Sequence, residues 1–471
     1  MTSGPRTIAE HTAAALARVR PVAAASVRVD DPAVVGLVLA ADVVAAAPVP
    51  AFDHAAMDGY AVRSADLPDD GSSVTLEVRG DRRPGVPSPA SAADAVGMKS
   101  AAPAPPGAAD FIPTTSDGGA ADGGAADGGA ADGGAADGGA VRIMTGAPVP
   151  DGFDAVVPVE RTSTSRFVAG GPTTERTVTL CRQARDHVRR AGTDLRRGDQ
   201  IARAGDVVGP GLVAIAAAAG LVELPVRRRP RVAVLSTGSE LAPLGTTEAG
   251  TIADSNSLML AALVRAAGAD VVRIGAVPDD ADALRAALDH VVGVKTAGPD
   301  RHDPADLMPT TGGVDLIVTS GGVSAGASDV VRELLASGSA ADVDVATVAM
   351  RPGKPQALAS WRGAPWIAVP GNPVSAFVST VLYALPAVRR LAGRPDRPAA
   401  TVRAATGWSS PPGKEQVVPV VTRPDGVTPA GRGGHQLSSL AHADALVVVP
   451  AEVAHVAPGD PLPHVPLPEA R

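Results

Sequence analysis

The stretch RVAVLSTGSEL, residues 231–241, decides the fold of the largest part of this 471-residue chain. Its first part, RVAVLST, is a strand pattern that runs directly into a loop of glycine and hydroxyl residues. Similar strand patterns occur at 270–277, 314–322 and 365–371, and helical patterns alternate with them at 255–268, 279–291, 328–337 and 373–393. Strands that alternate with helices predict a parallel α/β sheet, whose ligands bind beyond the carboxyl ends of its strands. We expect the first of these helices to be capped by Ser255 or Asn256 and closed by Gly268.

Outward from this stretch, the pattern predicts further domains. A short helix is expected at 7–19, apolar segments broken by Gly and Pro indicate a β-rich domain, and an Ala-rich helix is expected at 212–219. Strand-like segments after Pro395 predict a small all-β domain at the C-terminus. The predicted division is a helix at 1–20 that joins the α/β domain, a linking domain I at 21–45 and 200–227, the β-rich domain II at 46–199, the α/β domain III at 228–395 and the β domain IV at 396–471.

Residues 84–140 differ from their surroundings in composition. A Pro, Ala and Ser-rich stretch is followed by five DGGA repeats, which begin at Asp117, Asp122, Asp127, Asp132 and Asp137. Paired glycines every five residues have little to bury and much backbone entropy to lose, so we predict a disordered insertion. Calcium-binding Gly/Asp repeats have a nine-residue period with a large apolar residue, which this repeat lacks. A second, shorter insertion is expected at 295–313.

Composition narrows the function classes. The chain has 42 Lys and Arg against 50 Asp and Glu, a formal net charge of −8, which argues against a nucleic-acid-binding protein. The single cysteine, Cys181, excludes intrachain disulfides and is interpreted as structural. The first 20 residues lack the apolar run of a signal peptide, and we take 211–222 as the longest apolar stretch, short of the roughly 20 residues that span a bilayer. We expect a soluble, cytoplasmic protein without nucleic-acid or membrane partners.

Three strand ends of the α/β domain carry loops suited to anions: LSTGSEL (235–241), TSGGVSAGASD (319–329) and VPGNPVS (369–375). Glycines there let backbone N–H groups approach an anion, and the following helix N-terminus adds positive potential. Asn372 is a good N-cap and Pro373 occupies a favoured first helical position. The alternative is that these loops are tight turns that bind no ligand. This alternative is less favoured when three such loops lie at one edge of the sheet. A dinucleotide site is not expected, because G-x-G-x-x-G does not follow a strand here.

The segment MRPGKP, 350–355, places Arg351 and Lys354 within four residues between two prolines. The prolines reduce the backbone entropy lost on ordering, and the two cations suit an oxyanion. The alternative is a solvated turn.

Acidic residues lie in polar contexts beside apolar segments. They are Asp58, Asp194, Glu240, Asp254, Asp279 and Asp329. Each taken alone is a cap or a solvated turn, whereas together they could hold Mg²⁺ against substrate phosphates. Thr145 and Arg189 add oxyanion donors. Phe52 and Tyr60 flank the Asp58 motif and indicate either a planar ligand or a small local core.

The ordered series FDHAAMDGYAV, VRIMTGAPVP, RRAGTDL, LSTGSEL, TSGGVSAGASD, MRPGKP, VPGNPVSA and GGHQLSSLAHAD resembles the molybdopterin molybdenumtransferase family, the MoeA proteins of bacteria and the E domain of gephyrin. The resemblance covers nearly the whole chain outside the two insertions. It implies an elongated, four-domain homodimer with a site between the α/β domain of one subunit and domain II of its partner. The implied reaction places molybdenum from molybdate on adenylylated molybdopterin, with Mg²⁺, and releases AMP.

The resemblance carries functional positions onto particular residues. The catalytic set is Asp58, Thr145, Arg189, Asp194, Glu240, Asp279 and Asp329, of which Glu240, Asp279 and Asp329 are the candidate Mg²⁺ ligands. For substrate binding the resemblance carries over Arg351, Lys354, Pro370 and Pro373. The full predicted substrate-binding set adds residues of the α/β domain that the resemblance does not carry over: Thr237, Gly238, Asn256, Ser320, Gly321, Gly322, Ser324, Gly371, Asn372 and Ser375. The chain departs from the family pattern at Thr193, Ser239, Thr347 and Gly434, and the last two remove a cation and a hydroxyl from the expected oxyanion surface.

Three further functions fit the sequence. A MogA-like adenylyltransferase, using ATP and molybdopterin, would share the α/β domain alone, whereas MDGYAV and RIMTGAPVP separate the two families. The same motifs would also occur in a non-catalytic molybdopterin-binding scaffold or in a paralogue that serves tungstate. A MogA-type adenylyltransferase and molybdoenzyme chaperones are the candidate protein partners.

Overall fold

The computed structural model describes residues 5–85, 138–168, 174–246, 248–293, 313–324, 329–397, 400–431 and 436–468. The described chain forms two compact units. Unit 1 contains Met1–Val43, Gln200–Ile215 and Val222–Arg471, and unit 2 contains Val44–Asp199 and Ala216–Leu221. The predicted insertions at 84–140 and 295–313 fall almost entirely outside the described residues. The finer division into five parts stays a prediction.

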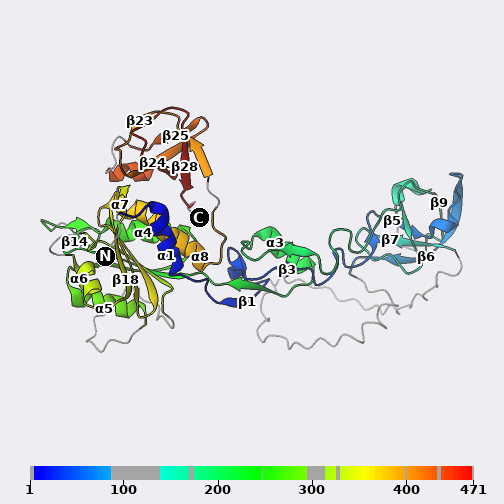
Figure 1. The fold of residues 1–471 in the computed structure, drawn as a ribbon. Helices are drawn as coiled ribbons and strands as arrows, with labels where there is room; N and C mark the ends of the chain where they lie inside the picture. The colour runs from blue at the N-terminus through cyan, green and yellow to red at the C-terminus, as the bar shows by residue number, and fades with distance from the viewer. Residues whose placement is uncertain are drawn as a thin grey trace. The chain divides into compact units, whose positions relative to one another are not determined.

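A six-stranded sheet forms the centre of unit 1, in the order β16-β13-β17-β21-β20-β18 (Figure 1). The strands are β13 (Arg231–Thr237), β16 (Asp270–Val277), β17 (Leu316–Ser320), β18 (Ala341–Thr347), β20 (Pro355–Trp361) and β21 (Ala364–Val369). The first four strands of that order are parallel, as predicted. The other two pair antiparallel at one edge and were not predicted. Arg362 and Gly363, both with positive φ, join β20 to β21 in a tight hairpin, which only antiparallel strands allow.

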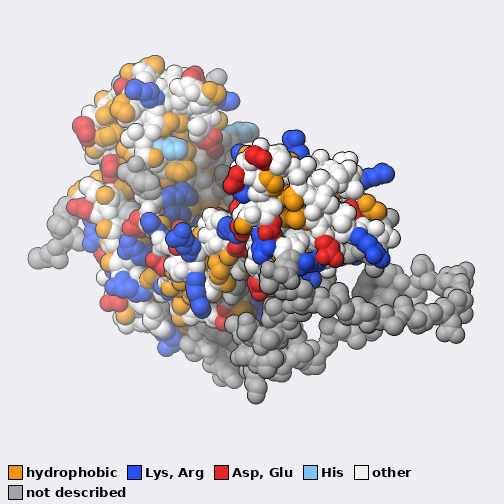
Figure 2. All heavy atoms as spheres, turned by 90° about the vertical axis from the view of Figure 1, so that its right-hand side faces the viewer, with side chains coloured by type: hydrophobic (Ala, Val, Ile, Leu, Met, Phe, Trp, Pro, Cys, Tyr) orange, Lys and Arg blue, Asp and Glu red, His pale blue; other side chains and the backbone are white. Residues whose placement is uncertain are grey.

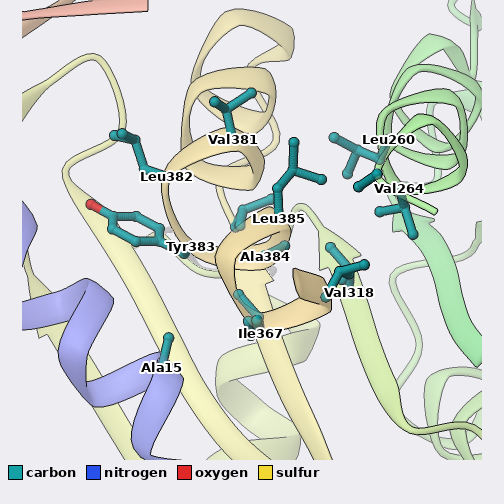
Figure 3. Packing of buried hydrophobic residues seen from close by; sticks show 14 of the residues in the cluster. Ala15, Leu260, Val264, Val318, Ile367, Val381, Leu382, Tyr383, Ala384 and Leu385 are labelled. Atoms are coloured by element: carbon teal, nitrogen blue, oxygen red, sulfur yellow. The ribbon is translucent and has the colours of Figure 1, made fainter. Parts of the chain in front are cut away.

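Helices cover both faces of this sheet. Val232 and Val234 of β13 face α1 (Ile8–Ala17), α4 (Ser255–Ala266), α7 (Pro373–Ser379) and α8 (Leu385–Leu391). Ala233 and Leu235 face the side of α5 (Ala281–Val291) and α6 (Val330–Ala336). Successive strand residues point to opposite faces, so a strand buried on both sides is apolar throughout. Figure 3 shows the first layer, in which Tyr383 lies beside α1 and Val318 and Ile367 rise from the sheet.

The helix after β21 is longer than the apolar stretch at 211–222, so the expectation that 211–222 is the longest was wrong. It runs over Pro373–Leu391, 19 residues, and by length and composition is apolar enough to cross a membrane. Since 83% of its most apolar 18-residue window is buried, it is a core helix of this unit. A π-helical segment, η6 (Thr380–Ala384), interrupts it just before Pro386. Proline has no backbone N–H to donate to the carbonyl four residues earlier, and a π turn accommodates that break.

The beginning of α4 also differs from its prediction. Its N-cap is Asp254, whose carboxylate accepts a hydrogen bond from the Ser257 backbone N–H at 3.0 Å and another from the Ser257 hydroxyl. Ser255 and Asn256, the predicted caps, are already the first helical residues. Asp254 was the better candidate because an ionised carboxylate at the N-cap also interacts with the helix dipole.

The rest of unit 1 contains two further sheets. One has the order β1-β12-β2, from β1 (Ala24–Arg28), β12 (Glu223–Arg227) and β2 (Val38–Leu39). The C-terminal sheet has the order β19-β24-β26-β28-β22, from β19 (Met350–Arg351), β22 (Ala400–Arg403), β24 (Glu415–Arg423), β26 (Ala445–Val449) and β28 (Pro461–Pro466), with β25 (Gly426–Pro429) beside β24. Short ladders pair β14 (Leu241–Ala242) with β15 (Ile252–Ala253), and β23 (Trp408–Ser409) with β27 (His455–Val456). The predicted β-rich C-terminal region is therefore confirmed.

Unit 2 is built on a five-stranded sheet in the order β8-β5-β7-β6-β9. The strands are β5 (Gly59–Val62), β6 (Ser73–Arg82), β7 (Ala140–Ile143), β8 (Ala155–Pro158) and β9 (Thr177–Cys181), and β4 (His54–Ala55) pairs separately with β10 (Val188–Arg189). Tyr60 is fully buried in this core against Phe167, whereas Phe52 is exposed. Tyr60 therefore belongs to a local core. Figure 2 shows acidic and basic side chains interspersed over the visible described surface, in keeping with the net charge.

Three short elements lie where the chain passes from one unit to the other. They are α3 (Pro210–Ala218), whose predicted bounds were 212–219, and the paired short strands β3 (Val43–Val44) and β11 (Gln200–Ala202).

Candidate functional site

Unit 1 has a cavity of about 640 Å³ at the carboxyl ends of β13, β17 and β21. The three predicted loops meet there, so the sheet places them as the alternating pattern predicted. Its predicted lining residues are Thr237, Gly238, Glu240, Asn256, Asp279, Gly321, Gly322, Ser324, Asp329, Pro370, Gly371, Asn372, Pro373 and Ser375. The lining residues that were not predicted are Leu241, Ile252, Ala253, Ser255, Val323 and Pro355.

Glycines let the three loops approach one another closely. A Cβ atom at Gly321 would lie 2.5 Å from the Thr237 carbonyl oxygen, and one at Gly371 would lie 3.3 Å from the Gly321 Cα. Gly321 also has φ +104°, a conformation that side chains rarely adopt. The glycines are therefore required by the packing of one loop against the next.

Asn256 ties two of these loops together from beneath the cavity. Its Nδ2 donates to the Ser320 Oγ at 2.8 Å and to the Gly371 carbonyl at 2.7 Å, and the Ser320 hydroxyl donates to the Pro370 carbonyl at 3.2 Å. Asn256 and Ser320 are both buried. Ser320, predicted to bind substrate, is not among the lining residues, and its hydroxyl holds the loops behind the cavity wall.

The beginning of α7 forms a further part of the wall. The Asn372 side chain caps the helix by accepting from the backbone N–H groups of Val374 and Ser375 at 3.1 and 3.2 Å, and Pro373 is the first helical residue. This agrees with the predicted cap. A helix N-terminus beside a polar cavity favours an anionic group.

Three carboxylates line the cavity, and each is held differently. Asp279 and Ser239 exchange hydrogen bonds, with the Ser239 N–H donating to the Asp279 Oδ2 at 3.2 Å and the Asp279 N–H donating to the Ser239 Oγ at 3.0 Å. The Ser324 hydroxyl donates to the Asp329 Oδ2 at 3.2 Å. The Glu240 carboxylate lies against Gly238, where a Cβ atom would be 2.7 Å from an Oε. Ser239, a departure from the family pattern, thus positions Asp279.

These carboxylates bear on the predicted Mg²⁺ site. Within the described residues, no group of three or more His, Cys, Asp and Glu side chains is placed to hold a metal ion. Mg²⁺ in proteins commonly takes one or two carboxylates and completes its shell with water and substrate phosphates. The oxygen donors present fit an ion held jointly with a substrate, and do not form a closed protein site.

The cavity wall also contains polar atoms without hydrogen-bond partners among the described residues, and an exposed apolar side chain. Among the described residues, Thr237 Oγ1 and Asn256 Oδ1 are buried without a hydrogen-bond partner. Ile252, in the short β14–β15 ladder, is 60% exposed and lines the cavity. An exposed isoleucine beside the predicted anion-binding loops offers a flat apolar surface to a ring, and the sequence reasoning did not select it.

Arg351 and Lys354 lie in segment 350–355 (MRPGKP), called the 350–355 loop, which connects β18 to β20. Its first two residues, Met350 and Arg351, form β19, which pairs with β24 of the C-terminal sheet. Both side chains are exposed, and within the described residues neither has an ion-pair or hydrogen-bond partner. Neither lines the cavity, although the adjoining Pro355 does. Thr347 is the exposed last residue of β18 and pairs with Pro355. The loop therefore offers two cations at the cavity margin.

Unit 2 contains the other predicted catalytic residues. Asp58 Oδ1 accepts hydrogen bonds from the Thr145 backbone N–H and hydroxyl, both at 2.7 Å, so these two form a pair at the surface. Arg189 lies on β10, opposite His54 of β4. Asp194 is exposed on the loop that follows.

That loop is anchored by a different aspartate. Arg190 pairs with Asp53 at 3.0 Å, and the Ala191 N–H donates to Asp53 at 2.7 Å, so the pKa of Asp53 is lowered, first by the Ala191 N–H and then by Arg190. Thr193, a departure from the family pattern, donates to the Arg190 carbonyl at 3.0 Å and so closes the turn. Gly434, the remaining departure, lies outside the described residues.

Comparisons with known proteins place this chain in one family along its whole length. Residues 6–220 match the MoeA N-terminal region (domains I and II), 233–390 match the probable molybdopterin-binding domain, and 401–467 match the MoeA C-terminal region (domain IV).

Individual relatives agree. The chain is 38% identical to molybdopterin molybdenumtransferase 2 of Mycobacterium tuberculosis, covering 91% of each chain, and 30% identical to molybdopterin molybdenumtransferase 1 of that organism, covering 90% of this chain and 91% of the relative. The solved structure of a molybdopterin biosynthesis MoeA protein from Pyrococcus horikosii shares the fold, with a TM-score of 0.72 at 24% identity over 99% of this chain and 100% of that one. The resemblance carried by the motifs is therefore confirmed, and the chain belongs to the molybdopterin molybdenumtransferase (MoeA) family.

Proposed function

We propose that this protein is a molybdopterin molybdenumtransferase, which inserts molybdenum from molybdate into adenylylated molybdopterin and releases AMP in the synthesis of the molybdenum cofactor. The observation that carries the proposal is the cavity at the ends of β13, β17 and β21, where anion-binding loops surround about 640 Å³. Matches to the MoeA N-terminal and C-terminal regions also support it. A MogA-like adenylyltransferase is not favoured, because it would resemble the α/β domain alone.

The cavity residues divide by chemistry. The glycine loops and the α7 N-terminus suit the phosphates of the substrate, and the exposed Ile252 suits its ring system. Arg351 and Lys354 supply cations for molybdate or a substrate phosphate, since oxyanion charge is stabilised best by preset donors. Thr237 and Asn256 leave buried polar atoms that a bound ligand or a water molecule could satisfy.

Glu240, Asp279 and Asp329 are the residues we propose to hold Mg²⁺. The ion would neutralise charge on the phosphoanhydride. Ser239 and Ser324 keep two of these carboxylates oriented before the substrate binds. The protein's own contribution is therefore to line the cavity with carboxylate oxygens and to present two cations on the adjoining 350–355 loop.

We further propose a cytoplasmic homodimer, in which Asp58, Thr145, Arg189 and Asp194 of one subunit serve the cavity of the other. This proposal rests on the family resemblance and on the surface pair of Asp58 and Thr145, which has polar atoms available to a ligand. Supply of substrate by a MogA-type adenylyltransferase and delivery of product to molybdoenzyme chaperones follow from the same proposal.

The test is AMP release from adenylylated molybdopterin, with molybdate and tungstate varied in parallel. We expect AMP release that requires the oxyanion, and the ratio of the two kcat/KM values gives the metal preference. Consumption of ATP with free molybdopterin would instead indicate an adenylyltransferase. Binding of adenylylated molybdopterin without turnover would indicate a scaffold.

A further inference from the structure

Beneath the 350–355 loop lies a buried glutamine that the predicted site does not include. Gln356, the second residue of β20, is fully buried, and its Nε2 donates to the Gly353 carbonyl and to the Ser379 Oγ, both at 2.7 Å. Since the Gly353 carbonyl can only accept, the amide NH₂ must face these two oxygens. One side chain thus joins the loop to the end of α7.

The two elements that Gln356 joins both belong to the site. Ser379, also fully buried, is the last residue of α7, and the first residues of α7 line the cavity. Gly353 lies between Arg351 and Lys354 in the loop. The amide therefore fixes the distance between the loop that bears the cations and the helix that begins at the cavity wall.

Tight packing around Gly353 supports the same arrangement. A Cβ atom at Gly353 would lie 3.0 Å from the Ser379 Oγ and 3.3 Å from the Met350 Cε. Met350 is held in turn by Tyr383, whose hydroxyl donates to the Met350 Sδ at 2.9 Å. Tyr383 belongs to the π-helical segment and lies toward α1 (Figure 3). The loop therefore has packed support below it, and π-helical turns are frequent at functional sites.

Residues of the 350–355 loop differ in their exposure to solvent. Pro352 and Gly353 are buried, whereas Arg351 and Lys354 on either side are exposed. The Val348 N–H donates to the Lys354 carbonyl at 2.9 Å and closes the base of the loop. Because the middle of the loop is held inward by Gln356, the two cations are left on the outside without partners among the described residues.

We infer that Gln356 is a positioning residue for oxyanion binding: its amide holds the 350–355 loop against α7 so that Arg351 and Lys354 act on one anion. The inference rests on the proposed function, because the anion is taken to be molybdate. Gln356 does not touch substrate. Its loss should weaken molybdate binding more than turnover, since Arg351 stays on β19, which pairs with β24, while the Lys354 side of the loop loses its fixed spacing from it.

The test compares Gln356→Met with Trp361→Phe. Methionine keeps the length and volume of the side chain but removes both donors. Trp361 is a matched control, because its buried Nε1 donates to Asp289 at 2.9 Å from the same strand, away from the loop. In the AMP-release assay, we expect Gln356→Met to raise the KM for molybdate about tenfold with kcat within about twofold, and Trp361→Phe to leave this KM unchanged.

Two further measurements keep the inference separable from the proposed function. In an Arg351→Ala/Lys354→Ala background, Gln356→Met should change the remaining activity less than twofold, because a residue that acts through the cations has nothing left to position. Hydrogen exchange of the backbone amides at 348–356 should rise in Gln356→Met and not in Trp361→Phe, whether or not the protein releases AMP. An unchanged KM in the folded Gln356→Met protein, a further loss in the cation-free background, or unchanged exchange would each overturn the inference. An inactive wild-type protein with the expected exchange pattern would instead count against the proposed function alone.

Discussion

In unit 1 the Asn256 amide beside the cavity is held by hydrogen bonds that join separate loops in the interior, whereas in unit 2 the Asp58 carboxylate is held at the surface by one neighbour. Asn256 links Ser320 to the Gly371 carbonyl beneath the cavity, and the side chains of Asn256 and Ser320 are buried. Asp58 is bonded only to Thr145 among the described contacts of its side chain. Buried networks fix geometry before a ligand arrives, while a surface pair can be replaced at small structural cost. We therefore expect substitutions in the unit 1 cavity to change catalysis most, and those in unit 2 to change catalysis with little effect on folding.

The largest expected effect is at Asp329 in the unit 1 cavity. Asp329→Asn keeps the shape of the side chain, and its amide oxygen can still accept from Ser324, but the negative charge is lost. AMP release should fall by roughly 10²- to 10³-fold, because charge stabilisation at the phosphoanhydride is the main task of this site. The free energy of unfolding should change by less than about 0.5 kcal/mol.

The matched control is Asp282→Asn, which removes the charge of a carboxylate that is 94% exposed on α5 and does not line the cavity. It should retain full activity. If Asp329→Asn released AMP within threefold of the wild-type rate, Asp329 would have no place in the catalytic set.

The buried packing of unit 1 around α1 can be tested by measuring the free energy of unfolding at different pH values. His11 of α1 is fully buried with its ring 4.6 Å from that of Tyr383, and burial lowers its pKa to about 4. The unfolded chain binds this proton near pH 6.5 and the folded chain only near pH 4, so the stabilisation is complete above pH 6.5 and is lost as the pH falls toward 4. The size of this loss is on the order of 3 kcal/mol. His11→Phe should remove it, so urea unfolding between pH 7.5 and 4.5 should show a shallower loss of stability than in wild type.

Because carboxylates also titrate in this range, only the difference between variant and wild type is informative. His442→Phe changes an exposed histidine and should leave the pH dependence as in wild type. Equal slopes for His11→Phe and wild type would mean that His11 can take up a proton within the fold, and that the core under α1 is less rigid than its packing indicates.

The two regions also differ in how far the sequence predicts them. The bounds of β13 and β16 agree with the predicted strands, because apolar residues between turn residues specify a strand locally. The three cavity loops followed from topology, since parallel strands bring their carboxyl ends to one edge. By contrast, β18 was missed: Asp and Val alternate over 342–345, but this exposed edge strand has no continuous apolar run like that of β13.

Contacts that depend on several distant segments could not be predicted. The Asn256 link needs α4, β17 and the loop after β21 to meet, and the Gln356 link needs the end of α7 beneath a hairpin. From the sequence alone, neither an asparagine at position 256 nor a glutamine at position 356 indicates such a contact. The pairing of Asp58 with Thr145 likewise joins residues 87 positions apart. The family resemblance chose both residues but gave no account of how one holds the other.

Asp58 in unit 2 should give a smaller effect than Asp329. Asp58→Ala removes the acceptor of both Thr145 hydrogen bonds at the surface, so we expect about a tenfold loss of AMP release with the unfolding free energy within about 1 kcal/mol of wild type. Thr145→Ala added to this variant should cost little more, because two residues that act as a pair are not additive. Asp70→Ala, which removes another exposed acid of unit 2 that accepts from a nearby N–H, should be silent. A loss of unfolding free energy well above about 1 kcal/mol for Asp58→Ala would contradict the comparison.

The smallest expected effect is at Cys181, at the end of β9 in unit 2. Its side chain is half-buried, and the Gln183 Nε2 contacts its Sγ at 3.5 Å and donates to its carbonyl at 3.1 Å. Serine preserves the size of the side chain and the backbone contact, so Cys181→Ser should change the unfolding free energy by less than about 0.5 kcal/mol and leave AMP release unchanged. Alkylation of the wild-type thiol gives the same answer by an independent route. A threefold or greater loss of activity in both would mean that unit 2 contributes a sulfur ligand, and its role could then no longer be described by the oxygen and nitrogen groups around Asp58.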